Sequence, residues 1–464
     1  MYMKRLIFNA ISSCLLIAIH PGRCDAQSER PNVIIIFCDD LGYGDLGVYG
    51  HPTIATPNLD RLATEGQKWT NFYCAAPVCT PSRAGLMTGR LPVRSGMASK
   101  RKRVLFPDSK GGLPQTEITL ARHLKKAGYA TGIIGKWHLG HLEEYTPMAH
   151  GFDYYFGIPY SNDMDRIQEG EYFASIKQQP PTEQFNVPLV RNNEIIERPA
   201  NQHTITRRYT EEAVRFIHTH QDKRFFLYLA HSMPHVPLFA SAPFKGKSAR
   251  GLYGDVVEEI DWSVGRVIDA LKATGLDRNT LVVFTSDNGP WLIFEEQGGS
   301  AGLLRGGKGG TFEGGMREPA IFWWPSKIKP GVVRELGSTL DLFPTLSAIA
   351  GLDLPDDRVY DGYDLLGTLL DGAKSPREEI FYYRDEEVYA IRQGPYKVHF
   401  ITQEDASPYH ERTVHADPLL YHVDHDPGER VDIADKHPGR IEAFRQLLER
   451  HNATIRPVVN QLER

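Results

Sequence analysis

Short strand-like runs alternate with amphipathic helical segments through most of the chain. The runs have the length of β-strands, and glycine ends several of the helical segments. The expected strands are VIIIF at 33–37, KWTNFY at 68–73, ATGIIG at 130–135, FFLYLA at 225–230 and LVVFTS at 281–286, and the expected helices cover 56–66, 80–89, 118–129, 210–221 and 257–275. This alternation predicts an α/β fold with a mostly parallel sheet that is covered by helices on both faces. The apolar stripe from Val256 to Leu271 is interpreted as core packing.

The pattern changes after the segment LDLFPTLSAIAGL, which ends at Leu352. Short strands separated by turn residues follow, and then one helical segment. The strands are expected at 379–383, 388–394, 396–401 and 418–423, and the helix at 441–451. We therefore expect a large domain at residues 27–352 and a smaller unit at 353–464, built from an antiparallel sheet and a helix. His399 in this unit either borders a pocket or packs in its core.

The first 26 residues have the pattern of a secretory signal peptide. Lys4 and Arg5 precede an apolar run that ends near Ile19, and small residues follow at a suitable cleavage point. A membrane anchor is the competing interpretation, but the run is shorter than the ~20 residues that a spanning helix needs. The sequence thus predicts an exported protein with no membrane segment after cleavage.

Cleavage after residue 26 leaves Cys38, Cys74 and Cys79. An odd number of cysteines in an exported chain does not indicate a disulfide scaffold. Cys38 and Cys74 end apolar runs, so we interpret them as small core residues or as one bridged pair.

Polar side chains follow directly after four of the expected strands, and the carboxyl ends of parallel strands meet at one edge of a sheet. They are Asp39 and Asp40 after the first strand, Lys136 and His138 after ATGIIG, His231 and His235 after FFLYLA, and Asp287 and Asn288 after LVVFTS. Carboxylate and amide oxygens are the ligands that calcium and magnesium prefer. Asp-Asp and Asp-Asn-Gly are also common turn sequences, but two such sequences at strand ends favour a cation site.

Cys79 begins the segment CTPSRAGLMTGR, in which Pro81 marks the first turn of a helix and Arg83 lies in the same turn. A helix N-terminus attracts anions, so a thiol at this position is expected to have a lowered pKa and to act as a nucleophile. A cysteine hydrolase of this kind would need a base such as His138 or His235. A soft thiolate is, however, an unusual neighbour for a hard cation.

The segment C-T-P-S-R-x-x-L-x-T-G-R resembles the signature of the type I sulfatases, in which the cysteine is converted to Cα-formylglycine. GKWHLG at 135–140 is similar to the second signature of that family. Further similar blocks are PNVIIIFCDDLGYGDLGVYG at 31–50, FTSDNG at 284–289 and LLRGGKGGTFEGGMREPAIFWWP at 303–325. The resemblance covers nearly the whole mature chain and is greatest to the branch of arylsulfatase A and N-acetylgalactosamine-6-sulfatase.

This resemblance implies an alkaline-phosphatase-like α/β fold and a sulfatase that hydrolyses sulfate monoesters, plausibly of a carbohydrate. It implies that a formylglycine-generating enzyme converts Cys79 to Cα-formylglycine, which Arg83 and Lys136 then fix in place. It further implies that His138 acts as a base, while His235, Lys308 and Ser161 contact the sulfate or protonate the leaving oxygen. One calcium ion would be held by the side chains of Asp39, Asp40, Asp287 and Asn288 together with the converted Cys79.

Two other functions fit parts of the pattern. A phosphomonoester or phosphonate hydrolase would use the same kind of site for another tetrahedral oxyanion, and a catalytically inactive protein could bind sulfated glycans. The formal net charge of -5 gives no basic footprint of the kind that nucleic-acid-binding proteins carry. Unlike the mammalian arylsulfatase A pattern, the chain has no cysteine between Ser161 and His203, and Asn162 stands where close relatives carry histidine. These departures leave the substrate open.

Overall fold

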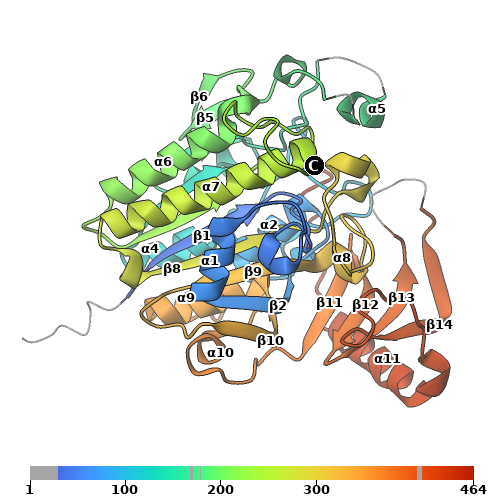
Figure 1. Cartoon of the computed structure of the whole chain (residues 1–464). Helices are drawn as coiled ribbons and strands as arrows, with labels where there is room; N and C mark the ends of the chain where they lie inside the picture. The colour runs from blue at the N-terminus through green and yellow to red at the C-terminus, as the bar shows by residue number, and fades with distance from the viewer. Residues whose placement is uncertain (1–29, 168–170, 178, 405–409) are drawn as a thin grey trace, which may run out of the picture.

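The computed structural model describes residues 30–167, 171–177, 179–404 and 410–464. The expected signal peptide at 1–26 lies outside these residues. Within them, ten strands form one sheet in the order β10-β2-β9-β8-β1-β7-β3-β4-β5-β6, and four more form a second sheet in the order β11-β12-β13-β14 (Figure 1). The strands of the larger sheet are β1 (Asn32–Cys38), β2 (Gln67–Tyr73), β3 (Ala130–Gly135), β4 (Tyr154–Gly157), β5 (Leu189–Arg191), β6 (Glu194–Glu197), β7 (Phe225–Ala230), β8 (Thr280–Ser286), β9 (Arg317–Trp323) and β10 (Gly331–Ser338).

The centre of the large sheet is parallel. β1 pairs in parallel with β7 on one side and with β8 on the other, so that Ile35 lies beside Tyr228 and Val283. β3 and β4 continue this parallel arrangement beyond β7, whereas β9 and β5 run antiparallel to their neighbours. The sheet is thus mixed and mostly parallel, as the sequence predicted, and its central strands deliver their carboxyl ends to one edge.

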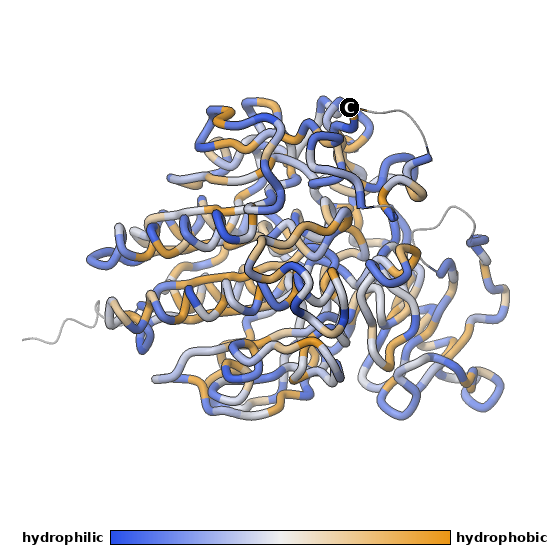
Figure 2. The backbone as a smooth tube through the Cα atoms, turned by 45° about the horizontal axis from the view of Figure 1, so that its top comes forward, coloured by the Kyte–Doolittle hydropathy of each residue, from blue (hydrophilic) through white to orange (hydrophobic). Residues whose placement is uncertain are grey.

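Helices cover both faces of this sheet. Ile34 and Ile36 of β1 belong to the core on the side of α1, α6 and α7, whereas Ile35 and Phe37 belong to the core on the side of α2, α4 and α9. Figure 1 shows α6 and α7 side by side, and in Figure 2 hydrophobic and hydrophilic segments alternate along such helices, because only one side of each is buried. The bounds are α1 (Pro57–Glu65), α2 (Cys79–Thr88), α3 (Pro92–Ser95), α4 (Leu120–Lys125), α5 (Tyr172–Lys177), α6 (Ile205–Thr219), α7 (Gly251–Ala273), α8 (Glu313–Met316), α9 (Leu342–Ala350) and α10 (Leu366–Asp371).

Three helices differ most from their predicted bounds, and one of them is α6, which begins at Ile205 and not at the predicted residue 210. α4 is shorter than expected because Thr119 accepts a hydrogen bond from the backbone of Arg122 at its start, and the chain turns through Gly128 with a positive φ of 81° soon after its end. α7 begins at Gly251, before the predicted residue 257, and most of its side chains along Val256–Leu271 are buried as predicted.

The smaller sheet consists of β11 (Glu379–Arg384), β12 (Glu387–Gln393), β13 (Tyr396–Thr402) and β14 (Thr413–His422), all antiparallel, and α11 (Pro438–Asn452) packs against it. A buried ionic cluster joins it to the large sheet. Lys397 Nζ on β13 lies 3.0 Å from an oxygen of Glu313 on α8 and 2.9 Å from one of Glu429. Lys397 also donates to the carbonyl of Thr311, so this sheet holds the glycine-rich loop that precedes α8.

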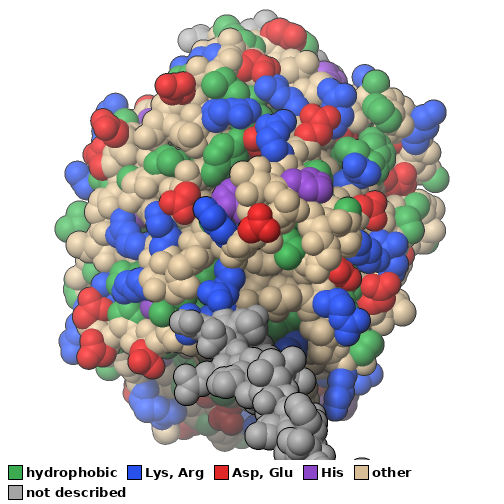
Figure 3. Space-filling view, turned by 90° about the vertical axis from the view of Figure 1, so that its left-hand side faces the viewer, with side chains coloured by type: hydrophobic (Ala, Val, Ile, Leu, Met, Phe, Trp, Pro, Cys, Tyr) green, Lys and Arg blue, Asp and Glu red, His purple; other side chains and the backbone are tan. Residues whose placement is uncertain are grey.

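The described surface carries charges of both signs. On the face drawn in Figure 3, Lys and Arg side chains lie interspersed with Asp and Glu side chains. Among the described residues there is no helix with the length and apolar content needed to cross a membrane.

Candidate active site

Two neighbouring central strands, β1 and β8, bring their polar carboxyl ends together. Asp39 and Asp40 follow β1, and Asp287 and Asn288 follow β8, its parallel neighbour. The backbone N–H of Asp40 donates to Asp287 Oδ1 at 3.1 Å, and Asn288 Nδ2 donates to Asp40 Oδ1 at 2.7 Å. Asp40 has a positive φ of 65°, a conformation that a non-glycine residue adopts only where its surroundings hold it. The two strand ends are therefore locked into one acidic cluster.

Three buried cations surround this cluster. Lys136 Nζ lies 2.6 Å from Asp39 Oδ2, Arg83 Nη2 lies 2.8 Å from Asp287 Oδ2, and Lys308 Nζ lies 2.8 Å from Asp40 Oδ2. Burial alone would raise the pKa of Asp39, but Lys136, His235 and Arg83 together hold it well below its ordinary value. Burial and the charge of Asp39 raise the pKa of Asp287. The carboxylates thus repel one another even with these cations in place.

The donor set of the cluster fits a further cation. Asn288 Oδ1 is buried and has no hydrogen-bond partner among the described residues. Ligand atoms of Asp39, Asp40, Cys79 and His235 all lie within 4.8 Å of one another. A hard cation would satisfy the orphaned amide oxygen and relieve the repulsion between the carboxylates. The buried acidic cluster can therefore hold a metal ion.

Cys79 lies at the N-terminus of α2, beside this cluster. Its side chain is buried, and Sγ donates to Asp39 Oδ1 at 3.3 Å. Burial and the charge of Asp39 raise the pKa of the Cys79 thiol well above its ordinary value. The expectation of a lowered thiol pKa is therefore wrong, because the helix N-terminus is outweighed by burial next to a carboxylate. Cys38 and Cys74 are free and buried, which excludes the bridged pair.

His138 faces the same space with one ring nitrogen available. Its Nε2 lies 2.8 Å from the carbonyl of Leu105, and Nδ1 is buried without a hydrogen-bond partner among the described residues. The carbonyl accepts only from a protonated Nε2, so in the neutral ring Nδ1 carries the lone pair. Burial and the charge of Lys136 hold the pKa of His138 well below its ordinary value. The ring is thus a neutral acceptor.

His235, Ser161 and Lys308 complete the polar end of the site. Ser161 Oγ lies 3.4 Å from His235 Nε2 and accepts from Lys136 Nζ at 3.2 Å. His235 Nε2 is also 3.6 Å from Asp40 Oδ2. Lys308 Nζ lies over the Trp291 ring, 4.1 Å from its centre, and this cation–π contact helps to hold the ammonium group.

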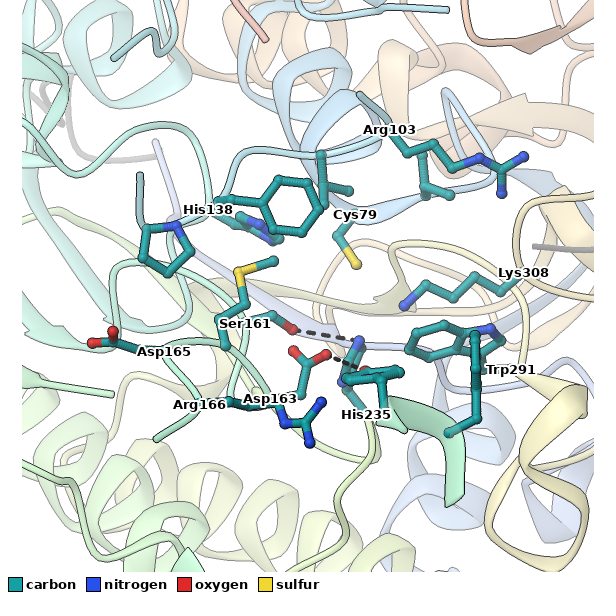
Figure 4. A pocket seen from close by; sticks show the side chains of 17 residues that line it. Cys79, Arg103, His138, Ser161, Asp163, Asp165, Arg166, His235, Trp291 and Lys308 are labelled. Atoms are coloured by element: carbon teal, nitrogen blue, oxygen red, sulfur yellow. Dashed lines mark hydrogen bonds between the residues drawn. The ribbon is translucent and has the colours of Figure 1, made fainter. Parts of the chain in front are cut away.

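These side chains open into a cavity of about 440 Å³. Figure 4 shows Cys79, His138, Ser161, His235 and Lys308 converging on it. Of the predicted site residues, these five line the cavity, while Arg83, Lys136, Asp39, Asp40, Asp287 and Asn288 lie behind its polar end. The remaining lining is largely aromatic and aliphatic, with a few charged side chains, and includes Arg103, Val104, Phe106, Asp163, Met164, Tyr172, Phe173 and Trp291.

Sequence reasoning missed the wall residues Asp163 and Trp291, although Trp291 follows the Asp-Asn-Gly motif closely. His231, the alternative to His235, is a core histidine whose Nε2 lies 3.3 Å from Ser263 Oγ. His399 is also buried away from the cavity, 2.7 Å from Glu429 Oε1. Of its two proposed roles, packing is therefore the one observed.

Two family models match the chain. The sulfatase model covers residues 31–352, and the model for the C-terminal region of aryl-sulfatase covers residues 375–464. The chain belongs to the sulfatase family. This sulfatase is 43% identical to human (Homo sapiens) arylsulfatase A, over 93% of this chain and 89% of that protein. It is 42% identical to N-acetylgalactosamine-6-sulfatase of Mus musculus, over 94% of this chain and 88% of that protein.

Among solved structures, the sulfatase is similar to the PsFucS1 sulfatase from Pseudoalteromonas sp., with a TM-score of 0.82 and 31% identity. That alignment covers 93% of this chain and 92% of the other. The predicted fold and the predicted enzyme class, a sulfuric ester hydrolase, are both confirmed. Formylglycine and calcium are typical of this family, and the acidic cluster is suited to a metal.

Proposed function

We propose that this sulfatase hydrolyses a sulfate monoester of a carbohydrate, using residue 79 as its nucleophile. The observation that carries the proposal is the convergence of Cys79, His138, His235 and Lys308 on one end of a cavity, directly above a buried acidic cluster. One relative, the N-acetylgalactosamine-6-sulfatase of Mus musculus, is named for a sulfated sugar, which supports a sugar as the leaving group. The cavity is large enough for a sugar ring and its substituents.

A calcium ion is proposed to bind at Asp39, Asp40, Asp287 and Asn288 together with residue 79. When bound, it would supply positive charge to the oxygens of the sulfate group. The hydrated aldehyde of Cα-formylglycine would supply two hydroxyl groups, one to attack sulfur and one whose deprotonation releases sulfate. A formylglycine-generating enzyme is the proposed partner that converts Cys79.

The remaining roles follow from the contacts of the chain itself. Arg83 and Lys136 hold Asp287 and Asp39 in place and keep positive charge beside residue 79. His138 Nδ1, the unpartnered ring nitrogen, accepts the proton from residue 79 as sulfate leaves. Lys308 and Ser161 bind sulfate oxygens. His235 Nδ1 lies 2.6 Å from the carbonyl of Val236 and donates to it, so Nε2 of the neutral ring is an acceptor. His235 therefore protonates the leaving oxygen from Nε2 in its doubly protonated form, and this Nε2 reaches the same space as Ser161.

The proposal is tested by measuring the release of inorganic sulfate from a panel of defined sulfated monosaccharides and oligosaccharides. An aryl sulfate and the matching aryl phosphate provide the comparison with a phosphate or phosphonate hydrolase. Release of sulfate from a sugar ester, with weaker turnover of the phosphate, is the expected result. Preference for the phosphate would contradict the proposal, and saccharide binding without any sulfate release would indicate an inactive glycan-binding protein.

We also propose that the mature sulfatase is exported after cleavage of residues 1–26. Lys4 and Arg5, followed by an apolar run that ends near Ile19, support export through a cleaved signal peptide. Sequencing the N-terminus of the secreted or periplasmic protein checks the cleavage point.

Replacing His235 with alanine should reduce activity most on poor leaving groups. A sugar alkoxide needs a proton as the bond to sulfur breaks, whereas an activated phenolate hardly does, and a positioned acid contributes about 10²–10⁴-fold. Values of kcat for a sugar sulfate and for 4-nitrophenyl sulfate measure the difference. The core variant His231→Ala is the matched control and should not distinguish the two substrates. Equal losses in His235→Ala would assign His235 a binding role only.

A further inference from the structure

The wall of the cavity contains buried polar atoms that nothing in the described chain satisfies. Besides His138 Nδ1, these are Asp163 Oδ1, Arg103 Nη1 and Trp291 Nε1, each on a residue that lines the cavity. Buried polar groups in folded proteins almost always have a partner. These residues of one cavity thus carry two open acceptors, Asp163 Oδ1 and His138 Nδ1, and two kinds of open donor, which indicates a ligand that itself both donates and accepts hydrogen bonds.

Asp163 is held firmly in this wall. Its Oδ2 accepts a hydrogen bond from the hydroxyl of Tyr172, which leaves Oδ1 as the open atom. The side chain is only 8% exposed, and in Figure 4 its carboxylate points into the space between Ser161 and His235. A ligand group that reaches Ser161 and His235 therefore comes close to Asp163.

The neighbouring residue Asn162 explains why Asp163 cannot turn away. Asn162 Nδ2 donates to Gln202 Oε1 and to the carbonyl of Pro237, both at 3.0 Å, and Gln202 Nε2 donates back to the carbonyl of Asn162 at 2.9 Å. Asn162 is buried behind the wall and does not line the cavity. Its amide thus fixes the segment that presents Ser161 and Asp163 together.

Trp291 forms an apolar surface across from this segment. Its ring centre lies 5.3 Å from that of His235, and Phe294 packs edge-on against it at 4.8 Å. Lys308 Nζ also lies over this ring, 4.1 Å from its centre. A sugar ring in the cavity thus meets apolar ring atoms on this side, while its hydroxyl groups need polar partners.

We infer that Asp163 recognises a hydroxyl or amide N–H group that lies beside the sulfate ester on the sugar ring. This inference rests on the proposed function and specifies its substrate: a carbohydrate sulfate with a hydrogen-bond donor next to the ester. The Asp163 carboxylate would repel a second anionic group on the substrate next to the sulfate ester. An aryl or steroid ring would offer this carboxylate no hydrogen-bond donor. The open Asp163 oxygen would then stay buried and unpaired, which costs affinity and rate.

The test compares Asp163→Asn with the wild-type protein on two kinds of substrate. The first is a panel of monosulfated hexoses and N-acetylhexosamines, from which the best substrate is taken, and the second is 4-nitrophenyl sulfate. The amide keeps the size of the side chain but is a weaker acceptor, so kcat/KM for the sugar should fall about 10- to 100-fold. The loss on the aryl sulfate should be at least about tenfold smaller, because that ring brings no donor.

Asp165→Asn is the matched control. Asp165 also lines the cavity, but its Oδ2 is already paired with Arg198 at 2.6 Å. This variant should change kcat/KM for both substrates by the same factor. Equal losses on both substrates in Asp163→Asn would reduce Asp163 to a structural role and overturn the inference.

The outcomes for the wild-type protein and for Asp163→Asn separate the inference from the proposed function. Turnover of a sugar sulfate, with equal losses on both substrates in Asp163→Asn, would overturn the inference while the proposed function stands. Turnover of 4-nitrophenyl sulfate with no turnover of any sugar in the panel would overturn the inference together with the proposed carbohydrate substrate. Failure on every sulfate ester, in protein whose residue 79 carries the aldehyde, would overturn the proposed function as well.

Discussion

Replacing Cys79 with serine should stop turnover and leave a sulfated enzyme. Serine has one hydroxyl, which can attack sulfur and displace the alcohol, but it has no second hydroxyl from which sulfate can be expelled. Loss of a nucleophile in hydrolases lowers kcat by about 10⁴-fold or more. Intact-mass measurement after incubation with a sulfate ester should show one sulfuryl group per chain, located at residue 79 by fragmentation.

Cys74→Ser is the matched control for this substitution. Cys74 is also a buried cysteine, but its Sγ donates to the carbonyl of Ala76 at 3.1 Å and it does not line the active-site cavity. This variant should retain turnover and acquire no sulfuryl group. Continuous release of sulfate by Cys79→Ser at the wild-type rate would contradict the role proposed for residue 79.

Removing the metal should abolish most activity and lower the melting temperature. Asp39, Asp40 and Asp287 are buried within one cluster, and the pKa of Asp287 is raised by burial and by the charge of Asp39. A carboxylate whose pKa is raised in the folded state destabilises that state as the pH rises through this pKa. The loss in melting temperature on chelation should therefore be larger at mildly alkaline than at mildly acidic pH.

Calcium added back should restore both the activity and the melting temperature. A ligand that binds only the folded protein stabilises it by mass action. Magnesium is the comparison ion, since it demands a tighter octahedral arrangement than this side-chain set is expected to give. Full activity in protein shown by elemental analysis to contain no metal would contradict the cation site.

The polar residues at the strand ends could be predicted because their positions depend only on local rules. Apolar runs such as VIIIFC form buried strands, parallel strands end at one edge, and whatever follows each run lies at that edge. Asp39 and Asp287 are 248 positions apart in sequence, yet their strands β1 and β8 are direct neighbours. The position of Lys308 could not be predicted from the strand ends, because it lies in a glycine-rich loop, which has no helical or strand periodicity.

The cavity wall and the thiol chemistry could not be predicted in this way. Asp163 comes into the wall through a loop that is fixed by hydrogen bonds between its neighbour Asn162 and Gln202, which lies 40 positions away in sequence. The raised pKa of Cys79 depends on how closely Asp39 approaches and on complete burial, neither of which a helix N-terminal pattern encodes. Five strands of the large sheet were also missed, namely β4, β5, β6, β9 and β10. β4, β5 and β6 are only three or four residues long, and β5 and β9 run antiparallel to their neighbours, outside the strand–helix alternation.

The central claim is that Cys79 is the precursor of the nucleophile and not the nucleophile itself. Mass spectrometry of the peptide that contains residue 79, measured alongside sulfate release, tests it most directly. Protein made together with a formylglycine-generating enzyme should show loss of the thiol and gain of an aldehyde, with activity proportional to the aldehyde fraction. Protein made without that enzyme should keep the thiol and be nearly inactive, whereas sulfate release at the full rate from unmodified Cys79 would contradict the account.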